Sequence, residues 1–297
     1  MHKKTGIALV VAGWLLTGAA HAALVAANNP NPGDTFTNAG GSNQGQAIGA
    51  SGWYYNNVRN NGAAGISTDY ARSGNGSAQL TTTQGPGGAS SKADIEFLAG
   101  GTNLGGNYYA SQSLGLFVNF TGMQYDWYRD GGSTNGAGQN PSLRILLDAD
   151  GDLATTGDRG GLVFERAYNG GGAVPVDAWV SDAVGSGAYL WNFGLGLATG
   201  SNINGTPYGY DATLAEWQAY FANAAILGFS AGVGSGWGPF DGAVDNIGWT
   251  IDGQAVSYNF EVDGGGAVPE PGSLALAGLA LLGLGAARCR QPRQHAR

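Results

Sequence analysis

Short segments of alternating apolar and polar residues recur along this 297-residue chain and limit its fold more than any other feature. The clearest is residues 256–262, in which apolar or aromatic side chains occupy every second position. An alternation of period two places one face of a strand against a core and the other toward water. Gly, Asn and Asp, which favour turns, separate these segments. The pattern predicts a mainly β chain.

About a dozen short strands are expected, and the best defined fall near residues 53–55, 78–81, 94–97, 116–120, 143–147, 162–165, 227–233 and 256–262. One helix interrupts them. Thr213 and Glu216 have the spacing of a capping box, and apolar residues follow at helical spacing to about Asn223. We therefore predict a single antiparallel β-sandwich, jelly-roll-like, with one short helix.

The first 22 residues have the three parts of a secretory signal peptide. Lys3 and Lys4 form a positive region, residues 7–16 are apolar, and Ala20 and Ala22 form an A-x-A cleavage site. This predicts a signal helix, passage through the Sec translocon and a mature chain that starts near Ala23. The alternative is an uncleaved N-terminal anchor.

The last 30 residues combine three features in a fixed order. Pro269, Glu270 and Pro271 precede an apolar run at 274–287, and four arginines follow it. The run is short for a bilayer, but the cations behind it fit the positive-inside rule. It predicts a short transmembrane helix; the alternative is a C-terminal core helix, although the run has no polar face.

This tail resembles the PEP-CTERM protein-sorting signal of Gram-negative bacteria, through Pro269-Glu270-Pro271, the apolar span and the terminal arginines. The resemblance implies transient anchoring in the inner membrane. It also implies removal of the tail by an exosortase-type transpeptidase and delivery to the cell surface or the extracellular matrix.

Five segments follow from these features. They are a signal peptide (1–22), a polar Gly/Asn-rich leader (23–49), a β-sandwich domain (50–262), a glycine linker (263–268) and the sorting signal (269–297).

Charge and residue usage exclude several classes of function. The chain has 13 basic and 21 acidic residues. Two basic residues fall in 1–22, and four basic residues and one acidic residue fall in 269–297, which leaves 7 against 20, a net charge of −13. Such a body is not expected to bind nucleic acid. All three histidines and the single cysteine lie in the segments to be removed. The body therefore lacks the residues for a Ser-His-Asp or Cys-His catalytic system, a zinc site of the usual kind or a disulfide.

Carboxylates at alternate positions form a candidate calcium loop at Asp148, Asp150 and Asp152. The second half of an EF-hand loop is missing, because Leu153 stands where glycine is needed and Arg159 where a bidentate Glu is needed. Asp158 could supply a ligand from another geometry. The alternative is a solvated turn between two strands, where Asp and Gly are favoured anyway. No other cofactor is expected.

Aromatic side chains suggest glycan binding, because flat rings stack on sugar rings. Trp127 and Trp237 are the candidates, whereas Trp217 and Trp249 are expected in the core. Residues 74–77 and 244–247 also resemble strands of lectin-like and carbohydrate-binding jelly rolls.

No catalytic residue is predicted. Glu96, Glu165 and Glu261 alternate with apolar residues, so solvated strand faces account for them. We predict an exported, non-enzymatic structural or adhesive component of the extracellular polysaccharide matrix or the cell surface, with exopolysaccharide as a partner. The alternatives are a carbohydrate-active enzyme that uses paired carboxylates and a lectin-like binding module.

Overall fold

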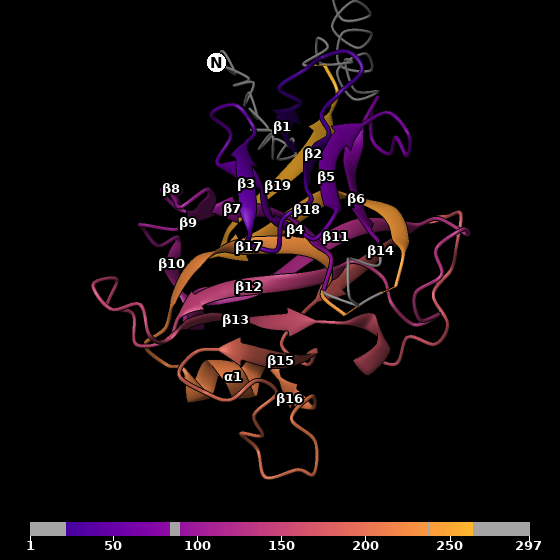
Figure 1. Ribbon diagram of the computed structural model, residues 1–297. Helices are drawn as coiled ribbons and strands as arrows, with labels where there is room; N and C mark the ends of the chain where they lie inside the picture. The colour runs from indigo at the N-terminus through magenta and orange to yellow at the C-terminus, as the bar shows by residue number, and fades with distance from the viewer. Residues whose placement is uncertain (1–21, 84–89, 237, 264–297) are drawn as a thin grey trace, which may run out of the picture.

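The computed structural model describes residues 22–83, 90–236 and 238–263 (Figure 1). In these ranges the strands form an eight-stranded sheet A, a nine-stranded sheet B and a two-stranded hairpin of β8 (Thr102–Leu104) and β9 (Asn107–Tyr109). The prediction of a mainly β sandwich with one short helix is confirmed for these residues. The predicted signal helix before Ala22 and the predicted transmembrane helix after residue 263 lie outside them. No helix in the described ranges is long and apolar enough to span a bilayer.

Sheet A contains β1 (Ala23–Ala26), β19 (Gln254–Glu261), β18 (Phe240–Ile251), β6 (Ser77–Thr82), β5 (Gly62–Ser67), β2 (Phe36–Asn38), β11 (Phe120–Arg129) and β14 (Trp179–Val184). The long β18 organises the sheet. One of its edges pairs with β11, and the other pairs first with β6 and then with β19. Among the described strand pairs only β1–β19 is parallel.

Sheet B runs in the order β16 (Ala212–Thr213), β15 (Tyr189–Gly194), β13 (Arg159–Phe164), β12 (Ser142–Asp148), β17 (Ala225–Gly234), β7 (Lys92–Leu98), β4 (Trp53–Arg59) and β3 (Gln44–Ala47), with β10 (Gly115–Leu116) also paired to β17. Its central strands are long and carry apolar side chains on the face toward sheet A. Figure 1 shows β16 and the helix α1 (Leu214–Tyr220) at the end of the molecule opposite to β1, β2 and β5.

Large aromatic rings fill the space between the two sheets. Trp53 of sheet B lies 4.9 Å from Phe260 of sheet A, measured between ring centroids. Phe229 stacks on Trp249 across the same layer at 4.3 Å. Such pairs stabilise a core beyond the area they bury. Trp249 therefore lies in the core, as predicted from its strand.

The helix α1 forms as its sequence predicts, although it ends earlier. The Thr213 side chain accepts a hydrogen bond from the Glu216 amide, and the Glu216 carboxylate accepts one from the Thr213 amide, which completes the capping box. Trp217 is fully buried and its Nε1 donates to the Leu190 carbonyl oxygen at 2.9 Å. This confirms Trp217 as a core residue.

Two local expectations need correction. Residues 23–49 are not a leader outside the sandwich, because β1, β2 and β3 lie within them and pair with β19, β5 and β4. The buried Asp34 helps to hold this segment, since it accepts a hydrogen bond from the Tyr55 hydroxyl at 2.6 Å.

Residues 116–120 do not form one continuous strand. The strand β10 ends at Leu116, and a 3₁₀ helix, Phe117–Asn119, precedes β11. This turn buries Phe117 and exposes Leu116 and Val118, whereas a continuous strand would place Leu116 and Val118 on the same buried face as Phe120. Alternation of only three apolar residues, Leu116, Val118 and Phe120, does not distinguish a continuous strand from a short strand followed by a 3₁₀ helix.

Candidate functional site

The outer face of sheet B carries a pocket of about 500 Å³. The strand register places its lining in rows. One row runs from Glu96 on β7 through Ser230 on β17 and Arg144 on β12 to Val163 on β13 and Trp191 on β15. At about 4.8 Å per strand this row is about 19 Å long. The pocket is therefore elongated across the strands.

Small residues at the middle of sheet B make room for the pocket. β17 turns Gly228, Ser230 and Gly232 toward this face, between longer side chains of β7 and β12. A Cβ atom at Gly232 would overlap the carboxylate of Asp94 and the guanidinium of Arg144. Glycine at this position is thus required by the close approach of an ion pair.

A buried charge cluster forms one wall. Arg144 Nη1 donates to Asp94 Oδ1 at 2.8 Å, and Lys92 Nζ forms an ion pair with the other carboxylate oxygen. Burial alone would raise the pKa of Asp94, but Arg144 and Lys92 hold it below its usual value. Burial and the neighbouring Arg144 lower the pKa of Lys92 to about 8, against the opposing effect of Asp94. One carboxylate is therefore shared by two cations.

A β-bulge brings two consecutive asparagines to the pocket. The register of β4 against β7 shifts between Asn56 and Arg59, and Asn57 has a φ of 51°. Consecutive strand residues normally face opposite sides, whereas a bulge re-aims a side chain. Both amides bind Glu96, with Asn56 Nδ2 at 2.6 Å from Oε2 and Asn57 Nδ2 at 2.9 Å from Oε1.

Glu96 is only 4% exposed. Burial, followed by the charge of Asp94, raises its pKa, and the Asn56 amide opposes this effect. The expectation that Glu96 lies on a solvated face is therefore wrong. Glu261, only 6% exposed, needs the same correction, because its carboxylate accepts hydrogen bonds from Asn75 and Asn259.

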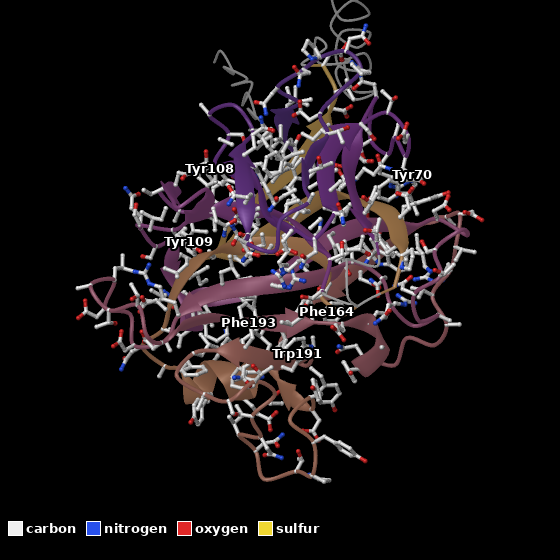
Figure 2. The ribbon with its side chains drawn as sticks, in the orientation of Figure 1. Tyr70, Tyr108, Tyr109, Phe164, Trp191 and Phe193 are labelled. Carbon is white, nitrogen blue, oxygen red and sulfur yellow. The ribbon has the colours of Figure 1, made fainter. Side chains whose placement is uncertain are left out.

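Aromatic rings stand at both ends of the pocket, near β9 and near β15 (Figure 2). Asn56 fixes the β9 end, since its side chain exchanges hydrogen bonds with the backbone N–H and carbonyl oxygen of Tyr108 at 3.0 and 2.9 Å. Tyr109 beside it is 47% exposed. At the other end Trp191 and Phe193 extend from the outer face of β15.

Glu165 lines the pocket near Trp191 and is half-buried. Burial raises its pKa, while Arg144 and the indole of Trp191 oppose the shift. The site thus combines charged groups, amides and flat apolar rings on one face of the sheet.

The sequence-based candidates fall elsewhere. Trp127 is fully buried, and its Nε1 donates to Asp182 Oδ2 at 2.8 Å. A buried ring offers no face to a sugar, so the prediction of Trp127 as a glycan-binding residue is wrong. Trp237, Ala20 and the Pro269-Glu270-Pro271 motif lie outside the described residues, and Ala22 is exposed just before β1.

The predicted calcium loop is partly assembled. Carboxylate oxygens of Asp148, Asp150 and Asp158 lie within 4.8 Å of one another. Asp152 is not part of this group, because its Oδ1 accepts the Ala154 amide and points back into the turn. Asp148 is fully buried and also accepts a hydrogen bond from Arg159 Nε at 3.0 Å. The third carboxylate is therefore Asp158, not Asp152.

Comparisons with known proteins give a match to a family model and weak likenesses to solved structures. No curated protein matches the chain. One solved structure, of carbohydrate-binding modules of the β-sandwich superfamily with promiscuous specificity, is 13% identical with a TM-score of 0.31. It aligns over 76% of this chain and 63% of its own, so the chain spans less than two thirds of it.

The second solved structure is Cip1, a cellulose-induced protein, which is 13% identical with a TM-score of 0.28 over 62% of this chain and 85% of its own. The family match is local and covers residues 267–291, which agree with the model of the PEP-CTERM protein-sorting motif. The chain thus carries a PEP-CTERM protein-sorting motif, which marks it as an exported protein and implies processing by an exosortase.

Proposed function

We propose that this exported protein is a structural or adhesive component of the extracellular polysaccharide matrix or the cell surface, and that it binds a glycan in the outer pocket of sheet B. One observation carries the proposal: an elongated pocket of about 500 Å³ combines amide and charged groups with aromatic rings at both ends. Binding sites for small molecules and sugars have this mixture of a few fixed polar groups and apolar surface.

The arrangement of the carboxylates favours binding over catalysis. Both oxygens of Glu96 accept hydrogen bonds from side-chain amides, and both oxygens of Asp94 pair with cations. A general acid needs a proton directed at the substrate, and a nucleophile needs a free oxygen. These two side chains are engaged by the protein itself.

A carbohydrate-active enzyme is the second candidate. Glu96 and Glu165 line the same pocket and both have raised pKa values, as a general acid requires. A reducing-end assay on polysaccharides distinguishes the two proposals. Turnover that Glu96→Gln and Glu165→Gln both abolish would establish the enzyme, whereas binding without turnover supports the matrix role.

The binding proposal is tested with a glycan array followed by calorimetry on the best ligand. Tyr109→Ala removes a half-exposed ring at the β9 end and should weaken binding about fivefold. The matched control is Tyr208→Ala, which removes a 68% exposed tyrosine that does not line the pocket. An equal effect of the two changes would contradict the proposed location.

The route of export is part of the same proposal. The Sec translocon would carry the chain, a signal peptidase would cut after Ala22, and the tail from Pro269 would hold it briefly in the inner membrane. Mass spectrometry of the protein recovered from outside the cell should then give a first residue near Ala23 and a chain that lacks the four terminal arginines. Recovery of an intact tail would contradict this route.

A further inference from the structure

The cations of this acidic protein are concentrated at the pocket. Between residues 23 and 268 the chain has seven basic residues, and four of them line the pocket: Arg59, Lys92, Arg144 and Arg159. Of the 20 acidic residues in the same range, three line it: Asp94, Glu96 and Glu165. The pocket therefore has a positive balance on a body whose net charge is −13.

Two of these cations, Arg59 and Lys92, lie opposite each other on neighbouring strands, beside the single carboxylate of Asp94. Arg59 on β4 and Lys92 on β7 are direct cross-strand partners, and both line the pocket. Like charges at opposed positions of a sheet destabilise it. Among the described residues no carboxylate lies within salt-bridge distance of Arg59, whose Nη1 donates to Asn43 Oδ1 at 2.6 Å. Burial lowers the pKa of Arg59 and the charge of Asp94 opposes this shift, so the single carboxylate of Asp94 serves Arg59, Lys92 and Arg144, and a bound anion would add a second.

The remaining cations do not remove this surplus. Lys92 and Arg144 share the single carboxylate of Asp94. The adjacent Glu96 is bound by two amides and forms no ion pair with the described cations. Arg159 has another role, because its guanidinium holds Asp148 and the carbonyl oxygens of Ala110 and Leu153. Arg59, which has no salt-bridge partner among the described residues, and Lys92, whose one carboxylate partner is shared with Arg144, are therefore the cations that the protein itself neutralises least.

From this juxtaposition we infer that the glycan bound by sheet B is acidic, with a uronate carboxylate placed between Arg59 and Lys92. The inference rests on the proposed function and specifies its ligand class. A planar guanidinium and an ammonium bind a carboxylate through charge-assisted hydrogen bonds. The rings near β9 and β15 then contact the apolar faces of neighbouring sugars along the row of about 19 Å.

The test uses pairs of oligosaccharides that differ only in charge. Oligomers of galacturonate, glucuronate and mannuronate are each compared with their methyl esters, in which the same chain is neutral. Calorimetry on the wild-type protein should give at least tenfold tighter binding of the acid than of the ester in one or more series. Equal affinity for acid and ester would overturn the inference and leave glycan binding intact. Failure of every acid and every ester to bind would also overturn the inference, and the proposed function would then fail only if the glycan array showed no ligand either.

A pair of charge variants locates the preference. Arg59→Gln should reduce the acid-over-ester preference at least fivefold, because it removes the cation without an ionic partner. Arg72→Gln is the control, since it removes the same charge outside the pocket, where Arg72 pairs with Asp126. An equal loss in both variants would show a general effect of net charge and would overturn the assignment to Arg59 and Lys92.

Discussion

Two clusters of charged residues lie along β12, and they differ in the sign of their net charge. At Arg144 the strand faces the pocket, where Arg59, Lys92 and Arg144 surround one ionised carboxylate, Asp94. At its end, Asp148 joins Asp150 and Asp158 in a turn with one nearby cation, Arg159. The first cluster is suited to an anion and the second to a cation.

The clusters also differ in what holds them together. In the acidic turn, local backbone amides compensate the carboxylates, as when the amide of Asp150 donates to Asp158 Oδ2 at 2.9 Å. In the pocket the partners come from β4, β7, β12 and β17 and are far apart in sequence, by 86 residues for the 3.2 Å hydrogen bond from Arg144 to Ser230. The turn is thus held mainly by contacts among residues 148–159, whereas the pocket depends on the whole sheet. The four predictions below test this contrast, starting with the largest effect.

Loss of Arg144 should destabilise the fold most. Arg144→Met removes one of the two cations that neutralise the buried Asp94, and breaking a buried pair costs about 3–5 kcal/mol. Urea denaturation measures the loss. Arg72→Met breaks a part-buried ion pair with Asp126, whose carboxylate keeps its hydrogen bonds from Ser181 and Asn246, and should cost about 1 kcal/mol. Similar losses of unfolding free energy in the two variants would show that the buried cluster stabilises the fold no more than the Arg72–Asp126 pair does.

Loss of Trp191 should have the largest effect on binding. Trp191→Ala removes the ring at the β15 end and should weaken glycan binding roughly 30-fold, or about 2 kcal/mol. Trp179→Ala is the matched control, because Trp179 lies on β14 of sheet A, next to Tyr128. Calorimetry on both variants measures the difference. A greater loss in Trp179→Ala would move the site to sheet A.

Binding of an acidic glycan should depend on pH through Lys92. Burial and Arg144 lower the pKa of Lys92 to about 8, and the surrounding charges are Arg59 of β4, Asp94 and Glu96 of β7 and Arg144 of β12. Lys92 is charged below this pKa and neutral above it. Affinity for a uronate should therefore fall about tenfold from pH 7 to pH 9.

The variant Lys92→Arg keeps the charge across this range and should remove the decline. Glu96 has a raised pKa and adds the same trend at lower pH, since its protonation leaves the pocket more positive. An affinity that rises with pH between 7 and 9 would be inconsistent with a carboxylate beside Lys92.

Calcium should act weakly and only at the acidic turn. We propose that Ca²⁺ binds Asp148, Asp150 and Asp158, whose oxygens converge within 4.8 Å. At five times its dissociation constant it should stabilise the fold by about 1 kcal/mol, a rise of about 3 °C in Tm. Asp150→Asn should abolish the shift, and Asp152→Asn should keep it. A shift that survives in Asp150→Asn would place the ion elsewhere.

Local sequence patterns correctly predicted the secondary-structure elements that are determined by residues close together in the sequence. The alternation of residues 256–262 and the capping box of Thr213 and Glu216 each specify their structure without help from distant parts of the chain. The alternate spacing of aspartates in the sequence also predicted two members of the carboxylate group, Asp148 and Asp150. The third, Asp158, is set by how the turn closes.

The pocket was missed because register and a bulge create it. Glu96, Arg144 and Trp191 occupy alternate strand positions that are typical of a solvated face, and no local signal places them in one row. By strand alternation Asn57 would lie on the opposite face from Asn56, and only the bulge turns it toward the pocket. The usable signals were Arg144 in an otherwise apolar strand and Lys92, the single lysine between residues 23 and 268.

The most direct test of the account follows the indole N–H signals by NMR while an oligosaccharide is added. We expect the Trp191 signal to shift and broaden, because its ring lines the pocket. The Trp217 and Trp127 indole signals should keep their positions and widths, since both rings are buried and their N–H groups donate to Leu190 and Asp182. A bound glycan that leaves Trp191 unchanged and shifts Trp179 would contradict a binding site on sheet B.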